Sequence, residues 1–82
     1  MKRIQYSDII QIGDEAYYVS SVHVDRIYET MVFKYDQEAE TVKSWAGLYS
    51  IRYKTRDEMA EGHKYTCENL ESLLSSNSEE EV

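Results

Sequence analysis

Two segments with the pattern of β-strands lie only two residues apart, and this spacing constrains the fold more than any other feature of the sequence. Ala16–Val24 (AYYVSSVHV) and Ile27–Tyr35 (IYETMVFKY) are rich in the β-branched and aromatic residues that favour strands. Only Asp25 and Arg26 separate them, and a connection of two residues joins antiparallel neighbours. The pattern therefore predicts an antiparallel hairpin.

The segments on either side extend this hairpin into a meander. Gly13-Asp14-Glu15 is a turn signal, so we expect a short strand over Ile9–Ile12. Asp36–Thr41 (DQEAET) is a charged connector, and Lys43–Lys54 has the pattern of a long strand. In that strand we expect one face to carry Trp45, Gly47, Tyr49, Ile51 and Tyr53, and the other Ala46, Leu48, Ser50 and Arg52.

A helix is expected after the last strand. Thr55-Arg56-Asp57-Glu58 has the form of a capping box, in which the threonine hydroxyl and the glutamate carboxylate accept from each other's backbone amides. Spacings of three and four residues then predict one buried stripe, formed by Met59, His63, Cys67 or Thr66, Leu70, and Leu73 or Leu74. Gly62 costs about 1 kcal/mol relative to alanine inside a helix, and a close approach to the sheet is a sufficient reason for it.

Together these elements predict an α+β fold, an antiparallel meander of three to four strands with one C-terminal helix packed on one face. The 82 residues suffice for a single domain, which we assign to residues 1–75. Residues 76–82 form an acidic segment with nothing to bury, so we expect a disordered tail there.

The formal net charge is −7, from nine basic and sixteen acidic side chains. This excess argues against direct binding of nucleic acid, which needs clustered lysine and arginine. It permits binding to a basic protein surface, although solubility alone also explains an acidic surface. The first residues lack the apolar run of a signal peptide, and the single cysteine, Cys67, favours a reducing compartment. We therefore expect a cytoplasmic protein with no membrane segment.

His63 and Cys67 stand four residues apart on the predicted helix, a spacing that aims both side chains at one point. His23 is the only further histidine, and no second pair completes a ligand set. We therefore expect a packed histidine and a buried thiol, with no metal and no cofactor. Cys67 follows in the second half of the helix, where the dipole disfavours a thiolate, and no glycine-rich phosphate loop is present, so we expect no enzymatic activity.

The eight tyrosines are too many for a core built by three strands and one helix. Some are expected on the outer face of the sheet, beside Glu29 and the acidic segment 36–40. Tyrosine among carboxylates is typical of protein interfaces. Exposed cross-strand tyrosine pairs also stabilise a sheet without any partner, so both interpretations stay open.

Three stretches together resemble a family of small uncharacterised proteins of tailed phages and prophages: Val19-Ser20-Ser21-Val22, Tyr28–Phe33 (YETMVF) and Tyr53–His63 (YKTRDEMAEGH). The family pattern is V-S-T-V, then F-E-T-M-V-F, then Y-x-T-x-x-E-A-x-x-G-H, and the match covers about residues 19–67. Ser21 stands in place of the family's threonine and Met59 in place of its alanine, and a longer Gly/Pro-rich insertion shrinks to Asp25-Arg26. The resemblance implies a phage origin and the same core, and it supplies no activity.

We therefore predict a phage-encoded inhibitor or modulator of a host defence protein, of anti-CRISPR or anti-restriction type, that acts by protein–protein binding in the host-cell cytoplasm. Mimicry of nucleic acid against a basic nucleic-acid-binding surface is one mode that suits the charge. The predicted contact residues are Tyr28, Glu29, Tyr35, Asp36, Glu38 and Glu40. One alternative is a minor virion or assembly component whose sheet edges pair with copies of itself. Another is a small-ligand-binding protein whose site forms at a homo-oligomer interface, such as that of a homodimer.

Overall fold

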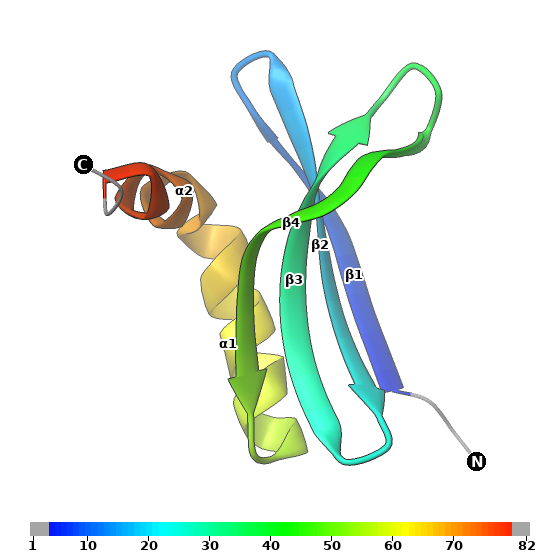
Figure 1. Ribbon diagram of the computed structural model, residues 1–82, viewed down its shortest axis with the longest axis vertical. Coiled ribbons are helices and arrows are strands. Elements are labelled where there is room, and N and C mark those ends of the chain that lie inside the picture. The colour runs from blue at the N-terminus through cyan, green and yellow to red at the C-terminus, as the bar shows by residue number, and fades with distance from the viewer. Residues whose placement is uncertain (1–3, 80–82) are drawn as a thin grey trace.

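The computed structural model describes residues 4–79, which form a four-stranded antiparallel sheet with two helices on one side of it (Figure 1). The elements are β1 (Ile4–Ile12), β2 (Glu15–Val24), β3 (Ile27–Asp36), β4 (Thr41–Tyr53), α1 (Arg56–Glu68) and α2 (Leu70–Glu79). The strands lie in chain order, so every connection is a hairpin. The α+β meander with a C-terminal helical segment packed on it, predicted from the sequence, is confirmed.

β1 is longer than the sequence pattern predicts, because it begins at Ile4 rather than five residues later. Its alternate residues face the helices: Ile10 packs on the buried core, and Asp8 bonds to a helix side chain. An aspartate in a core-facing position breaks the apolar alternation, which is why the pattern missed the first half of the strand. The two-residue β2–β3 turn was expected, and Asp25 adopts a φ of 57° there, which aspartate tolerates better than most residues.

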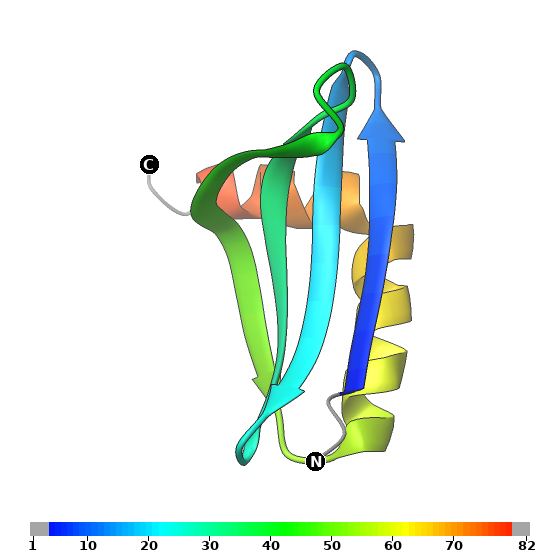
Figure 2. The ribbon, with the colours of Figure 1, turned by 90° about the vertical axis from the view of Figure 1, so that its right-hand side faces the viewer.

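The core lies between the sheet and the helices, which occupy the same side of it in the turned view (Figure 2). Its fully buried centre consists of Val19, Val32 and Leu70, and around it pack the half-buried Ile10, Ile12, Tyr17, Tyr49, Cys67 and Leu74. Burying a side chain of this size contributes about 1.5–3 kcal/mol. α1 packs mainly on β2 and β3, and α2 packs on β4.

α1 begins as the sequence predicts. Thr55 Oγ1 accepts from the Glu58 amide at 3.1 Å, and the Glu58 carboxylate accepts from the Thr55 amide at 3.3 Å, so the capping box is confirmed. The buried residues of this helix are Met59, His63 and Thr66. Of the two residues that the spacing left open, Thr66 therefore takes the buried position, and Cys67 is half-buried at its edge.

The expected single helix is interrupted at Asn69, whose φ of −119° and ψ of 21° are not helical. Its backbone N–H makes the last i→i−4 bond of α1, to the Tyr65 carbonyl at 3.0 Å, and its side-chain amide donates to the same carbonyl at 2.9 Å. α2 then leaves in a new direction (Figure 1) and continues to Glu79. Residues 76–79 of the expected tail are thus helical, as an extension of a helix that Leu74 holds against the core. Residues 80–82 lie outside the described residues.

The first half of β4 bends towards the outer face of the sheet, the face opposite the helices. Val32 pairs with Tyr49 and Lys34 pairs with Ser44. These paired positions are two residues apart on β3 and five residues apart on β4, which is a large bulge in β4. The bulge places Trp45 against an aromatic ring of the outer face, while Tyr49 stays on the helix side. The prediction that these two residues share one face is wrong, because a period of two does not survive a bulge.

Candidate functional site

A row of five polar side chains, here called the polar chain, crosses the sheet beneath α1. At its β4 end, Tyr53 Oη donates to Thr30 Oγ1 at 3.0 Å, and Thr30 Oγ1 lies 2.5 Å from Ser21 Oγ. Ser21 Oγ lies 2.6 Å from His63 Nδ1, and His63 Nε2 lies 2.8 Å from the Asp8 carboxylate on β1. Strand register makes this row possible, because Ser21 and Thr30 are direct partners across β2 and β3.

In the polar chain each side chain is able to donate a hydrogen bond to the next one, from Tyr53 towards Asp8. If His63 carries its hydrogen on Nε2, it donates to Asp8, and Nδ1 accepts from Ser21, which accepts in turn from Thr30. Among the side chains of residues 5–75, every buried nitrogen or oxygen has a partner. Because an unpaired buried polar group is costly, the polar chain fixes the position of α1 on the sheet.

Cys67 joins the polar chain at its exposed end, one turn of α1 after His63. Its Sγ donates to the same Asp8 oxygen at a distance of 3.9 Å. Burial, and then the negative charge of Asp8, raises the pKa of the Cys67 thiol to about 11, so the thiol is protonated at neutral pH. The order Asp8, His63, Ser21 is that of a serine-hydrolase triad, but Ser21 is 0% exposed. Neither the protonated Cys67 thiol nor the buried Ser21 hydroxyl is therefore available as a nucleophile in this conformation.

His63, Cys67 and His23 were the possible metal ligands in the sequence, and the structure brings only the first two together. His23 instead stacks on Tyr28, with ring centroids 4.0 Å apart. Asp8 was not predicted to join them, because the sequence pattern did not indicate a strand over residues 4–8. The available signal was the spacing of two residues from Asp8 to Ile10 and from Ile10 to Ile12, which places all three on one face of a strand.

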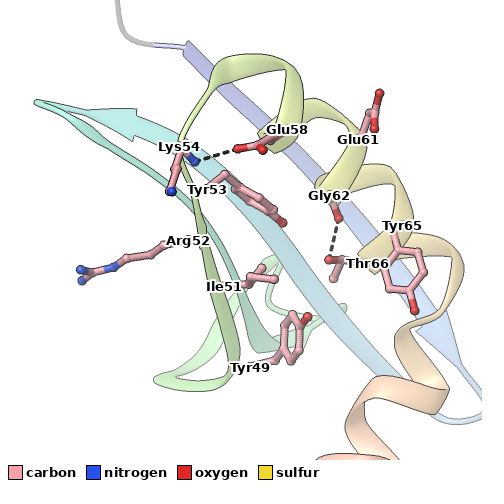
Figure 3. Close-up of a pocket in the computed structure, with 10 residues that line it drawn as sticks. All are labelled: Tyr49, Ile51, Arg52, Tyr53, Lys54, Glu58, Glu61, Gly62, Tyr65 and Thr66. Carbon is pink, nitrogen blue, oxygen red and sulfur yellow. Dashed lines mark hydrogen bonds between the residues drawn. The ribbon is translucent and has the colours of Figure 1, made fainter.

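A hollow of about 730 Å³, here called the β4–α1 hollow, opens where α1 leaves β4 uncovered (Figure 3). Its lining residues are Tyr49, Ile51, Arg52, Tyr53, Lys54, Glu58, Glu61, Gly62, Tyr65 and Thr66. The Tyr53 ring lies so close to α1 that a Cβ on Gly62 would be 2.2 Å from Tyr53 Oη, which confirms the close approach expected for this glycine. Burial, and then the neighbouring Tyr53 and Tyr65, raises the pKa of Tyr49.

The outer face carries an aromatic cluster. Tyr18 of β2 and Phe33 of β3 are direct partners across the strands. Phe33 meets Trp45 edge-on with ring centroids 5.1 Å apart, and Tyr18 stacks with Tyr35 at 6.3 Å. Phe33 is buried, whereas Trp45 is 69% exposed. Apolar side chains that gather in an exposed patch are typical of interaction sites.

Next to this cluster, two hairpin turns bring acidic side chains together at one end of the sheet. They border a hollow of about 390 Å³, lined by Asp14, Glu15, Ala16, Tyr35, Asp36, Gln37, Glu38 and Lys43. Asp36 shapes its own turn, because its carboxylate accepts from the amides of Glu38 and Ala39 at 3.0 and 3.1 Å. Tyr35 lines the acidic hollow and also stacks on Tyr18, so the acidic end adjoins the aromatic cluster at this residue. We call them together the acidic–aromatic surface, with the residues Asp14, Glu15, Tyr18, Phe33, Tyr35, Asp36, Glu38 and Trp45.

The six predicted contact residues fall into two groups at opposite ends of β3. Tyr35, Asp36 and Glu38 line the acidic hollow, and the exposed Glu40 follows in the same turn, with a φ of 55°. Tyr28 and Glu29 lie near the β2–β3 turn, on opposite faces of the sheet because they are consecutive in a strand. Glu29 pairs there with Arg52 at 3.4 Å. Trp45, Tyr18, Asp14 and Glu15 were not predicted from the sequence to be parts of one surface.

No protein-family model matches the chain, and the comparisons with curated proteins and with solved structures found no match. The resemblance to small phage proteins therefore stays a prediction. No helix in the described part of the chain is long and apolar enough to cross a membrane.

Proposed function

We propose that the chain works by binding another protein through the acidic–aromatic surface, against a partner with a basic surface. The observation that carries the proposal is the exposure of Trp45, which is 69% exposed although its ring rests on the buried Phe33. A partner that covers this ring orders a side chain that one aromatic contact already restrains. Tryptophan and tyrosine are enriched among the residues that dominate binding energy.

The charges beside this cluster favour a basic partner. Asp14, Glu15, Asp36 and Glu38 border one hollow, in which Lys43 is the single cation among the lining residues. Carboxylates grouped in this way attract a basic surface, accelerate its association and make binding sensitive to salt. An aromatic centre with a charged border is also the usual arrangement of a protein interface.

The biological role that we propose is inhibition of a host defence protein by a phage-encoded binder. It is supported by the resemblance to small phage proteins and by the net charge of −7. On this proposal the acidic end occupies a site on the partner that otherwise holds nucleic acid, as a mimic of phosphate charge. The host-cell cytoplasm is the compartment in which such a partner would be met.

The test is a comparison of variants in host lysate. The tagged chain should retain one nucleic-acid-handling protein at low salt and release it as the salt concentration rises. Trp45→Ala and the pair Glu15→Lys with Glu38→Lys should each lose that protein. Asp36 is left unchanged because its carboxylate holds the β3–β4 turn.

The matched control is the pair Glu68→Lys with Glu71→Lys, which changes the charge equally at exposed positions of the helices. These variants should retain the partner. Equal retention by all variants would overturn the assignment of the surface. Retention of phage structural proteins or of copies of the chain alone would favour the virion alternative instead.

The β4–α1 hollow favours a second candidate, the binding of a small ligand. Its volume of about 730 Å³ lies within the range of ligand pockets, and Tyr49, Tyr53 and Tyr65 line it. A second copy of the chain placed against β4, an edge strand, would close the hollow. Mass spectrometry of the intact protein under native conditions tests this candidate, which requires a homo-oligomer that carries a bound small molecule.

A further inference from the structure

Three side chains capable of binding a metal converge at the β1 edge of the sheet. Asp8 comes from β1, and His63 and Cys67 come from consecutive turns of α1. One ligand atom from each lies within 4.8 Å of the other two. His63 Nε2 is 2.8 Å from Asp8 Oδ2, and Cys67 Sγ is 3.9 Å from the same oxygen.

These separations are close to those of a tetrahedral zinc site. Zinc bond lengths of about 2.1 Å to oxygen or nitrogen and about 2.3 Å to sulfur imply nitrogen–oxygen separations of about 3.4 Å and sulfur–oxygen separations of about 3.6 Å. The nitrogen–oxygen pair has to open by about 0.6 Å and the sulfur–oxygen pair to close by about 0.3 Å from the distances in the structure. The third pair, the His63 ring nitrogen and Cys67 Sγ, lies within 4.8 Å, and a tetrahedral site holds such a pair about 3.6 Å apart. Asp8 is exposed and Cys67 is half-buried, so both side chains have room to rotate.

The polar chain orients the His63 ring in a way that suits metal binding. Zinc-binding histidines are usually oriented by a hydrogen bond to the second ring nitrogen, and Ser21 makes that bond to Nδ1 at 2.6 Å. A hydroxyl both donates and accepts, so Ser21 is able to accept from Nδ1–H when Nε2 binds a metal. Thr30 lies within hydrogen-bond distance of Ser21 and holds the hydroxyl in place in either state.

The cluster is also accessible. The Asp8 side chain is 57% exposed, whereas that of His63 is 8% exposed, so an ion approaching from solvent meets the carboxylate first and the imidazole behind it. Three protein ligands leave a fourth tetrahedral position for water. A set of one thiolate, one imidazole and one carboxylate suits zinc rather than magnesium or calcium, which require oxygen ligands.

We propose that Asp8, His63 and Cys67 form a three-ligand site for Zn²⁺, with Ser21 as the residue that positions His63. On binding, the Cys67 thiol releases its proton to solvent, and the proton on His63 Nε2 is replaced by one on Nδ1. The site lies on the helix side of the sheet, away from the acidic–aromatic surface, so the proposal stands independently of the proposed partner.

The experiment is a titration of the chelator-treated full chain with Co²⁺ and then Zn²⁺, followed by absorption spectroscopy. The chain should bind one Co²⁺ with a thiolate-to-cobalt charge-transfer band and tetrahedral d–d bands, and Zn²⁺ should displace it. Cys67→Ser should abolish the charge-transfer band. Asp8→Asn and Ser21→Ala should weaken binding at least tenfold. That loss is usual when a residue that hydrogen-bonds to a metal ligand is removed, and it is a lower limit for the loss of a ligand itself.

Matched controls are His23→Gln and Asp14→Asn, which remove the other histidine and a carboxylate outside the cluster. They should leave the affinity and the spectrum unchanged, and circular dichroism should show that every variant is folded. The proposal is overturned if the chain binds no Co²⁺ at micromolar concentrations, or if Cys67→Ser leaves the spectrum intact. Loss of binding in the control variants would equally overturn it.

Discussion

Gly62→Ala offers a sharp test of how α1 packs on the sheet, because helix propensity and packing predict opposite results. Alanine is better than glycine inside a helix by about 1 kcal/mol. In this structure, however, the new Cβ would lie 2.2 Å from Tyr53 Oη and 2.3 Å from Cε1 and from Cζ. Ordinary carbon contacts are about 3.5–4.0 Å, so the ring must move by more than about 1 Å.

That movement has two costs. Overpacking of this kind typically costs about 1–3 kcal/mol. The displaced ring also gives up the bond from Tyr53 Oη to Thr30, worth about 0.5–1.5 kcal/mol. After the gain in helix propensity, the free energy of unfolding should fall by about 1–3 kcal/mol. With a urea dependence of about 1 kcal/mol/M for a small domain, the midpoint of urea unfolding should fall by about 1–3 M.

The assay is urea unfolding followed by circular dichroism, in two backgrounds. When Tyr53→Ala removes the ring, Gly62→Ala should become stabilising, by up to about 1 kcal/mol. The effect of one substitution therefore changes sign with the other. A stabilising or neutral Gly62→Ala in the otherwise unchanged chain would refute the placement of Tyr53 against α1.

Three further predictions follow from single contacts. Thr55→Ala should lower the free energy of unfolding by about 0.5–2 kcal/mol, because it removes the hydroxyl that accepts from the Glu58 amide. Thermal or urea unfolding measures this change, and an unchanged midpoint would contradict the prediction. In the metal-free chain, Cys67 should react with iodoacetamide far more slowly than a free thiol. The reason is that a pKa raised from 9.0 to about 11 lowers the thiolate fraction at pH 8 by a factor on the order of 100. Equal rates in the folded and the urea-unfolded protein would contradict this prediction. The unfolded thiol ionises above its ordinary pKa of 9.0 while the folded thiol keeps its proton up to about 11, so stability should fall across that pH range, and Cys67→Ser should lose this part of the slope.

Local sequence patterns predicted the parts of the fold that depend on neighbouring residues. The hairpin around Asp25 followed from the short gap between two strand patterns, and the capped start of α1 followed from Thr55 and Glu58. Gly62 inside a helical pattern indicated a close contact with the sheet, which Tyr53 makes. In the first two cases, the residues that determine the structure lie within a few positions of each other in the sequence. In the third case, a glycine inside a helix has few physical reasons, and a close contact is one of them.

The features that were missed depend on contacts between distant residues. Asp8 and His63 are 55 positions apart, and no local pattern connects a carboxylate in an unrecognised strand to a helix histidine. The bulge in β4 is set by how that strand wraps over the sheet, so the side on which Trp45 lies did not follow from alternation. Likewise, the union of Asp14 and Glu15 with Asp36 and Glu38 requires knowing that two turns meet at one end of the sheet.

The central claim, that the acidic–aromatic surface binds a partner protein, is tested most directly by cross-linking from a single position. A photoreactive phenylalanine derivative in place of Trp45 should form a covalent adduct with one host protein when host lysate is irradiated. The same group in place of Tyr65, which is 57% exposed on α1, serves as the control and should form no such adduct. An adduct from position 65 alone, or none from position 45, would contradict the claim.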